Sequence, residues 1–113
     1  MFNVFYFFIL IVCLPFMAKY TNVVRFKVKN GKQSKFEDIF KKSDKWPGML
    51  LHVLAKTGDQ NYVAYGLWES EEKMRLAMPE MISLLDKTRD LLEELSPEHG
   101  VTDPVSGTVI IET

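Results

Sequence analysis

The sequence predicts an α+β domain built on one four-stranded antiparallel sheet with its helices on one face. The first observation is a pair of strand-like runs at 49–56 and 61–68, rich in Val, Leu and Tyr, around a short loop that holds Gly58 and Asp59. Such a pair predicts a β-hairpin. The second is Ser70, followed at once by two glutamates, which is typical of a helix start. The third is the order of elements, strand, helix, strand, strand, helix, strand, which is the split βαβ or ferredoxin-like arrangement.

The first half of the domain shows both periodicities. Residues 22–29 alternate, with Val24, Phe26 and Val28 on one side and Val23, Arg25, Lys27 and Lys29 on the other, which predicts a strand with one apolar face. In 34–42, apolar residues recur every three to four positions, which predicts a short amphipathic helix with Ser34 as its N-cap.

The second half begins with a long helical pattern that extends from Ser70 to Leu95. Pro79 interrupts it, so we expect two helices or one kinked helix. The segment 98–104 resembles a loop, and the β-branched run 108–111 predicts the last strand.

The composition limits the number of domains and the kinds of partner that we expect. The chain has 113 residues, 47% of them hydrophobic and 26% charged, with a net charge of -1. These values predict a single domain, which we place at 19–113. A nucleic-acid partner is not expected, because binding it requires a concentrated basic surface. Cys13 is the only cysteine, so no intramolecular disulfide can form.

The first 18 residues form a separate apolar segment without a charged side chain. Three interpretations compete: a secretory signal, a membrane anchor, or upstream sequence with translation starting at Met17. A signal would need a basic start and small residues before a cleavage site, and an anchor would need about 20 apolar residues without Pro15. We favour the start at Met17 and a cytoplasmic protein. A membrane-anchored or exported protein is the alternative if residues 1–18 are retained.

The hairpin also predicts a partner. With Gly58 and Asp59 as a two-residue turn, Val53 opposes Ala64, and both faces of the hairpin are apolar. The face expected to meet the helices carries Met49, Leu51, Val53, Ala55, Tyr62, Ala64, Gly66 and Trp68. The other face carries Leu50, His52, Leu54, Val63, Tyr65 and Leu67. Because two helices cover only one face, we expect a homodimer through the second face.

Three segments resemble the antibiotic biosynthesis monooxygenase-like group: VVRFKVKNGKQSKFEDIF, PGMLLHVL and YVAYGLWESEEKM. The resemblance covers most of 20–78, and its most specific element is Trp68 followed by a serine and acids. It implies a dimeric α/β barrel, with a pocket between sheet and helices in each subunit. The group includes cofactor-independent monooxygenases of polycyclic phenols, haem-degrading enzymes, quinol oxygenases and isomerases.

The resemblance also bears on cofactors. Haem degraders of this group carry a histidine ligand on the second helix, and 70–95 contains none. Their first-strand asparagine is replaced by Val24, with Asn22 two residues earlier on the same face. The two histidines of the chain are far apart and form no HxH or HExxH spacing, so we expect neither a metal nor a cofactor.

Candidate site residues follow from the predicted faces. A hydrophobic or aromatic small molecule would contact an apolar pocket, with an aromatic ring to stack on it and soft methionines around it. The candidates for substrate binding are Trp68, Tyr62, Phe26, Met74, Met78 and Met81; each is also an ordinary core residue of such a fold. The candidates for acid–base catalysis are Tyr62, His52 and His99. A structural hydrogen bond at the dimer face is the competing role for His52, and a solvated loop position is that for His99.

Three functions remain open. One is a cofactor-independent monooxygenase, or a related enzyme, for an aromatic or quinol-type substrate that forms its own electron-rich anion, so that the protein needs only to deprotonate and orient it. The second is a non-catalytic homodimeric module that binds a hydrophobic metabolite. The third is an interaction protein held at the membrane by residues 1–18.

Overall fold

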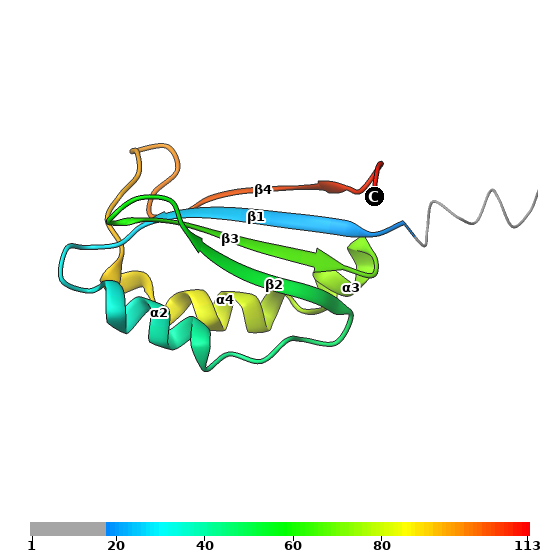
Figure 1. Cartoon of the computed structure of the whole chain (residues 1–113), viewed down its shortest axis with the longest axis horizontal. Coiled ribbons are helices and arrows are strands. Elements are labelled where there is room, and N and C mark those ends of the chain that lie inside the picture. Colours follow the sequence, from blue (N-terminus) through cyan, green and yellow to red (C-terminus); the bar gives the residue numbers. More distant parts are fainter. Residues whose placement is uncertain (1–17) are drawn as a thin grey trace, which may run out of the picture.

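The protein folds into two layers, with one antiparallel sheet above and the helices below (Figure 1). The computed structural model describes residues 18–113, so the apolar N-terminal segment lies almost wholly outside it. The strand order is β2-β3-β1-β4, and the ferredoxin-like prediction is confirmed. The elements are β1 (Tyr20–Lys27), α2 (Gln33–Lys41), β2 (Met49–Lys56), β3 (Asn61–Trp68), α3 (Glu71–Leu76), α4 (Met78–Asp86), the 3-10 helix η2 (Arg89–Leu91) and β4 (Asp103–Thr108).

The hairpin and the helix after it form where the sequence predicts them. Strands β2 and β3 have the predicted bounds. Ser70 caps α3, because its Oγ accepts a hydrogen bond from the backbone N–H of Lys73 at 3.2 Å. The predicted break near Pro79 is also present, since α3 ends at Leu76 and α4 begins two residues later with the proline in its first turn.

The hairpin register differs from the predicted one. Thr57 N–H donates to the carbonyl of Asn61, so the loop has three residues instead of two, and Leu54 opposes Ala64. A one-residue slip moves every side chain of a strand to the other face. The prediction that His52 and Leu54 lie on the dimer-facing side is therefore wrong: both share the helix-facing side with Ala64 and Gly66.

The contacts of Gln60 explain the slip, and a bulge at Leu50 ends it. Gln60 forms two hydrogen bonds with Val28, just after β1. Its carbonyl accepts from Val28 N–H at 2.8 Å, and its Nε2 donates to Val28 O at 2.9 Å. A bulge at Leu50 then restores the predicted pair of Met49 with Trp68. The outward-facing residues of β2 are consequently Leu51 and Val53, which are 45% and 40% exposed.

Other boundaries also differ. Helix α2 starts one residue before Ser34, after Lys32, and no side chain caps it, so Ser34 is not its N-cap. The helical pattern after Ser70 ends at Asp86 instead of 95, and its last part forms η2 and an extended segment. Strand β4 lies at 103–108, before the predicted run. It contains a proline, which an edge strand tolerates because its outer N–H groups need no partner.

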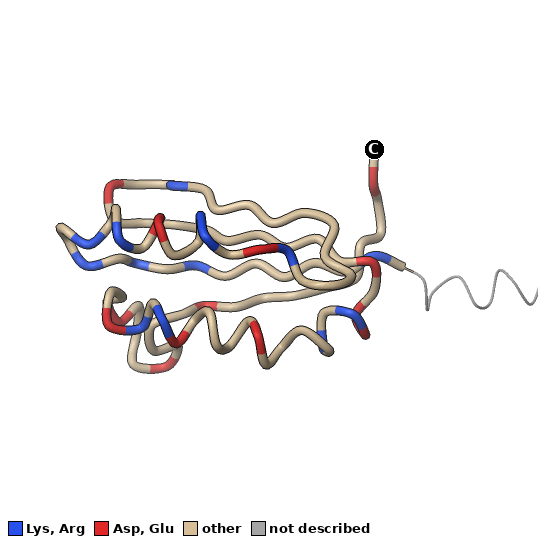
Figure 2. Tube along the Cα trace, turned by 90° about the horizontal axis from the view of Figure 1, so that it is seen from below, with Lys and Arg blue, Asp and Glu red and all other residues tan. Residues whose placement is uncertain are grey.

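The interior contains two apolar clusters at opposite ends of the sheet. The larger consists of Phe26, Val28, Phe36, Tyr62, Ala64, Leu91 and Leu92. The smaller consists of Met49, Trp68, Met74 and Ala77, with Tyr20, Trp46 and Met81 packed against it. Within residues 18–113, no helix is long and apolar enough to span a membrane. Basic and acidic residues are interspersed along this part of the chain (Figure 2), as the near-neutral composition indicates.

Candidate functional site

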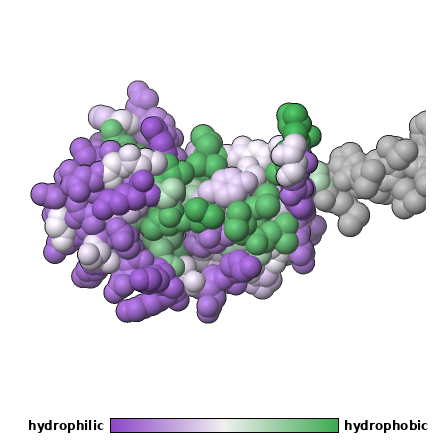
Figure 3. Space-filling view, viewed as in Figure 1, coloured by the Kyte–Doolittle hydropathy of each residue, from purple (hydrophilic) through white to green (hydrophobic). Residues whose placement is uncertain are grey.

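A cavity of about 400 Å³ lies between the sheet and helices α3 and α4. Its wall is mostly apolar, and the rim on α4 includes Met78 and Ile82, which are 42% and 47% exposed. Apolar side chains also gather in the middle of the face shown in Figure 3. A mostly apolar cavity of this size with a few polar groups is typical of a small-molecule site.

Three polar side chains of the cavity, those of His52, Asn22 and Ser106, lie in one row across the sheet. His52 pairs with Gly66, Gly66 pairs with Asn22, and Asn22 pairs with Ser106, so all four face the same side. All four line the cavity. Because Gly66 has no side chain, the side chains of Asn22 and Trp68 pack closely over it. His52 lies on one flank of Gly66, and Asn22 and Ser106 lie on the other.

Gly66 is also needed for close packing beneath the cavity. A Cβ at this position would lie 2.4 Å from Asn22 Oδ1 and 2.9 Å from Trp68 Nε1. These two atoms form a hydrogen bond, in which Trp68 Nε1 donates to Asn22 Oδ1 at 2.7 Å. The Asn22 amide is thereby held in place, and its Nδ2 donates to the weak acceptor Met81 Sδ at 3.7 Å.

The aromatic wall of the cavity comes from Trp46. The chain reverses before β2 at Gly48, whose φ of +84° favours glycine, and Met49 N–H donates to Trp46 O at 2.9 Å. This turn places Trp46 parallel to Trp68, with ring centroids 6.2 Å apart and an interplanar angle of 5°. Trp46 lines the cavity, whereas Trp68 is completely buried behind it.

His52 lies between two aromatic rings. Its ring centroid is 5.8 Å from that of Phe40 and 5.8 Å from that of Trp46. Burial lowers the pKa of His52 below its ordinary value of 6.5, so the imidazole is neutral at pH 7. On the helix-facing side of the sheet, it is the only ionisable side chain among the lining residues that 18–113 provides. His52 is therefore the side chain of the site that can accept a proton from a bound compound.

The cavity brings together some of the predicted binding residues. Phe26, Met74, Met78 and Met81 line it, as predicted residues of a pocket wall. Trp68 does not line it, although it supports Trp46 and Asn22 from behind.

Tyr62 lies at the other end of the sheet, in the larger core cluster. Its hydroxyl donates to Glu37 Oε2 at 2.5 Å. Burial, the Glu37 hydrogen bond and nearby negative charges raise the pKa of Tyr62 to about 12. The side chain is therefore neutral and held by a structural hydrogen bond, outside the cavity.

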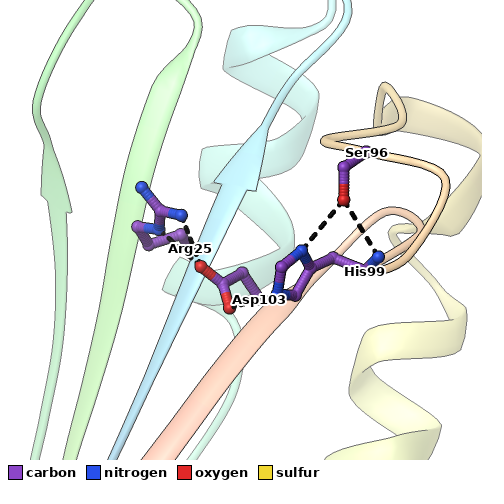
Figure 4. Close-up of polar contacts among 4 residues, drawn as sticks. All are labelled: Arg25, Ser96, His99 and Asp103. Carbon is purple, nitrogen blue, oxygen red and sulfur yellow. Dashed lines mark hydrogen bonds and ion pairs between the residues drawn. The ribbon is translucent and has the colours of Figure 1, made fainter.

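His99 lies in a separate polar cluster that closes the loop before β4 (Figure 4). Its Nδ1 is 2.9 Å from Ser96 Oγ, and its Nε2 is 3.5 Å from Asp103 Oδ1. The other carboxylate oxygen of Asp103, Oδ2, pairs with Arg25. Ser96 Oγ accepts the His99 backbone N–H at 3.0 Å, as in a local turn. None of these side chains lines the cavity. The cluster thus fastens the loop to the sheet.

Two residues of the site are not among the predicted site residues. Trp46 lies in a connection, where periodicity assigns no face. Asn22 is one of several polar residues around the start of β1, and its function depends on contacts with β3 and α4.

Among residues 18–113, no three His, Cys, Asp or Glu side chains are grouped so that they could hold a metal ion.

Comparison with known proteins identifies the family. The family model described as antibiotic biosynthesis monooxygenase matches residues 19–77, which is more than half of the chain. The chain belongs to this family. The match includes β1 to α3 and hence His52, Trp46 and Asn22, but it ends before α4 and β4. No curated protein matches significantly.

Solved structures of the family share the fold. SnoaB, a cofactor-independent oxygenase from Streptomyces nogalater, is 22% identical with a TM-score of 0.66, over 84% of this chain and 96% of its own. A monooxygenase from the ActVA-Orf6 gene of Streptomyces coelicolor, in complex with nanaomycin D, is 23% identical with a TM-score of 0.63, over 86% and 95%. The NE2512 protein of unknown function from Nitrosomonas europaea is 17% identical with a TM-score of 0.66, over 87% and 95%. At these identities the similarity shows the fold alone.

Proposed function

We propose that the protein is a cofactor-independent oxygenase for planar, oxygenated aromatic compounds, with His52 as the base. The observation that supports it most is a neutral imidazole set in the wall of a mostly apolar cavity, between two aromatic rings. Among the solved structures that share the fold, SnoaB is a cofactor-independent oxygenase, and the ActVA-Orf6 monooxygenase is in complex with nanaomycin D. Both properties are carried over to this chain as part of the proposal.

The reaction needs little from the protein. In an anthrone, the methylene carbon loses a proton to His52, and the resulting carbanion is electron-rich enough to reduce O₂. Combination of the two gives a carbon-bound peroxide anion, which takes a proton back to become a hydroperoxide, and loss of water then leaves a ketone. One oxygen atom enters the product and the other leaves as water, so electrons balance without a cofactor. Trp46 would stack on the rings and the apolar wall would exclude bulk water.

The test is oxygen uptake by the purified full chain with dithranol, a dihydroxyanthrone, followed by hydroquinones and catechols. We expect turnover without an added cofactor. His52→Gln should lower kcat by roughly 10²-fold or more, which is the usual contribution of a general base. His99→Gln is the matched control and should behave as the wild type, since His99 lies outside the cavity.

A non-catalytic binding module is the second candidate, because the cavity is mostly apolar. Under it, dithranol would quench tryptophan fluorescence but no oxygen would be consumed. That result would contradict the oxygenase and favour the binding module. Oxygen uptake that is equal in wild type and His52→Gln would remove His52 from the mechanism.

We further propose a homodimer through the outward face of the sheet. This face carries a continuous group of apolar side chains that the helices leave uncovered: Val23, Leu51, Val53, Val63, Tyr65, Leu67 and Val105. Val105 is 61% exposed. An exposed apolar surface of this kind is usually an interface. Light scattering should give twice the chain mass for the wild type, and Val53→Glu should give the single mass; a monomeric wild type would contradict the proposal.

A further inference from the structure

His52 belongs to the walls of two cavities. Besides the main cavity, a smaller one of about 170 Å³ lies between α2 and β2. Its lining residues are Glu37, Phe40, Lys41, His52 and Leu54. Phe40 and His52 line both cavities, so these two side chains form the partition between them.

The two cavities differ in character. The main cavity has a mostly apolar wall, whereas the small one carries a carboxylate and an ammonium group, Glu37 and Lys41, one turn apart on α2. The Glu37 side chain is 47% exposed, so the small cavity communicates with solvent. Its volume is sufficient for several water molecules, and polar walls are the condition for water to stay there.

His52 has both ring nitrogens available. Within residues 18–113, neither nitrogen forms a hydrogen bond with protein, and no fully buried polar side-chain atom in that range lacks a partner. The nitrogens of His52 are therefore not sealed in the core but lie against open space. A neutral imidazole can accept a proton on one nitrogen and release the other nitrogen's proton, which makes it a natural relay.

Glu37 is held in place as an acceptor. Its Oε2 receives the Tyr62 hydroxyl at 2.5 Å and lies 3.9 Å from Lys56 Nζ. Both contacts use the same oxygen, and no hydrogen bond within the described chain occupies Oε1. One carboxylate oxygen thus fixes the side chain while the other remains able to accept a proton from water.

We propose that the small cavity is the proton outlet of the main cavity, with His52 as the relay and Glu37 as the acceptor at its solvent end. The proton taken from a bound compound enters on one His52 nitrogen and leaves from the other through water to Glu37. Glu37 exchanges the proton with solvent, and the same path in reverse returns one proton to the peroxide anion, so that the reaction releases no proton overall. This inference rests on the proposed function, which assigns His52 as the base.

The test uses the full chain with dithranol and oxygen uptake as the readout. Glu37→Gln keeps an oxygen for the Tyr62 hydroxyl but cannot take up a proton. We expect kcat to fall roughly tenfold with KM unchanged, because proton transfer to and from His52 is slowed and binding is not. Added formate, a carboxylate small enough for the cavity, should restore kcat in this variant. Asp38→Asn is the matched control on α2, outside both cavities, and should have no effect.

A second readout is independent of turnover. In NMR titrations, Glu37→Gln should lower the pKa of His52, because a negative charge across the small cavity is lost, and Lys41→Gln should raise it. Unchanged pKa values in both variants would overturn the outlet. So would a Glu37→Gln variant with wild-type kcat, or with a low kcat that formate does not restore, because these results indicate no role or only a structural one. Wild-type protein that consumes no oxygen would instead overturn the proposed function, and the outlet with it.

Discussion

The two ends of the sheet contain the same kinds of residue but pack them differently. At one end, Phe26, Phe36, Phe40 and Tyr62 fill the space under the sheet, and the centroids of neighbouring rings lie 4.9 to 5.9 Å apart. At the other end, Trp46 and Trp68 stack against one wall, and an open volume of about 400 Å³ remains. The surface follows the same division in Figure 3, with hydrophilic side chains over the closed end and apolar ones near the open end.

The difference shows how a small domain can keep a cavity without losing its fold. A close-packed aromatic cluster stabilises the fold through the hydrophobic effect, since Phe26, Phe36 and Tyr62 are almost completely removed from water. The open end can then leave apolar side chains such as Met78 and Ile82 half-exposed. Substitutions at the closed end should therefore reduce stability, and those at the open end should mainly reduce binding.

Phe36→Ala should have the largest effect on stability. Phe36 is completely buried and contacts Phe26, Phe40 and Tyr62, so its removal leaves a cavity that these rings cannot fill. We expect the free energy of unfolding to fall by about 3–5 kcal/mol in urea titrations. Met78→Ala, at the half-exposed rim, is the comparison and should cost far less. Equal losses in the two variants would remove the distinction between the ends.

Gly66→Ala should have an intermediate effect. The new Cβ would collide with Asn22 Oδ1 and Trp68 Nε1 and break the hydrogen bond between them. We expect a loss of about 1–3 kcal/mol, the usual cost of overpacking, together with weaker quenching of tryptophan fluorescence by dithranol. Gly107→Ala is the matched control, because nothing lies within 4 Å of its added Cβ. A Gly66→Ala protein with wild-type stability and binding would show that the packing of Asn22 and Trp68 does not require glycine at position 66.

Tyr62→Phe should have the smallest effect. It removes the hydrogen bond to Glu37, so the free energy of unfolding should fall by about 1 kcal/mol, and ligand binding should not change. The pKa of Tyr62 is raised from 10.0 to about 12, so the unfolded chain releases this proton first as the pH rises. Wild-type stability due to this group should thus be complete below pH 10 and decline toward about pH 12. The decline should be smaller in Tyr62→Phe, and ultraviolet absorbance of tyrosinate provides a second check.

The sequence predicts the elements better than the site. Local signals determine the hairpin bounds and the Ser70 cap, because strand propensity and capping act within a few residues. The hairpin register depends on loop length. The loop has one residue more than predicted because Gln60 forms hydrogen bonds with Val28, and this change places His52 in the cavity instead of on the outer face. Strand β4 depends on pairing with β1, which overrides the weak strand propensity of its proline and glycine.

The placement of His52 is the central claim, and the two histidines of the chain allow a direct measurement. The imidazole signals of His52 and His99 can be followed by NMR while an anthraquinone, which O₂ does not oxidise, is added to the full chain. We predict that the His52 signals shift on binding, that its pKa lies below 6.5 before addition, and that the His99 signals stay in place. Binding that leaves the His52 signals unchanged would contradict the account, because it would indicate that His52 does not line the cavity.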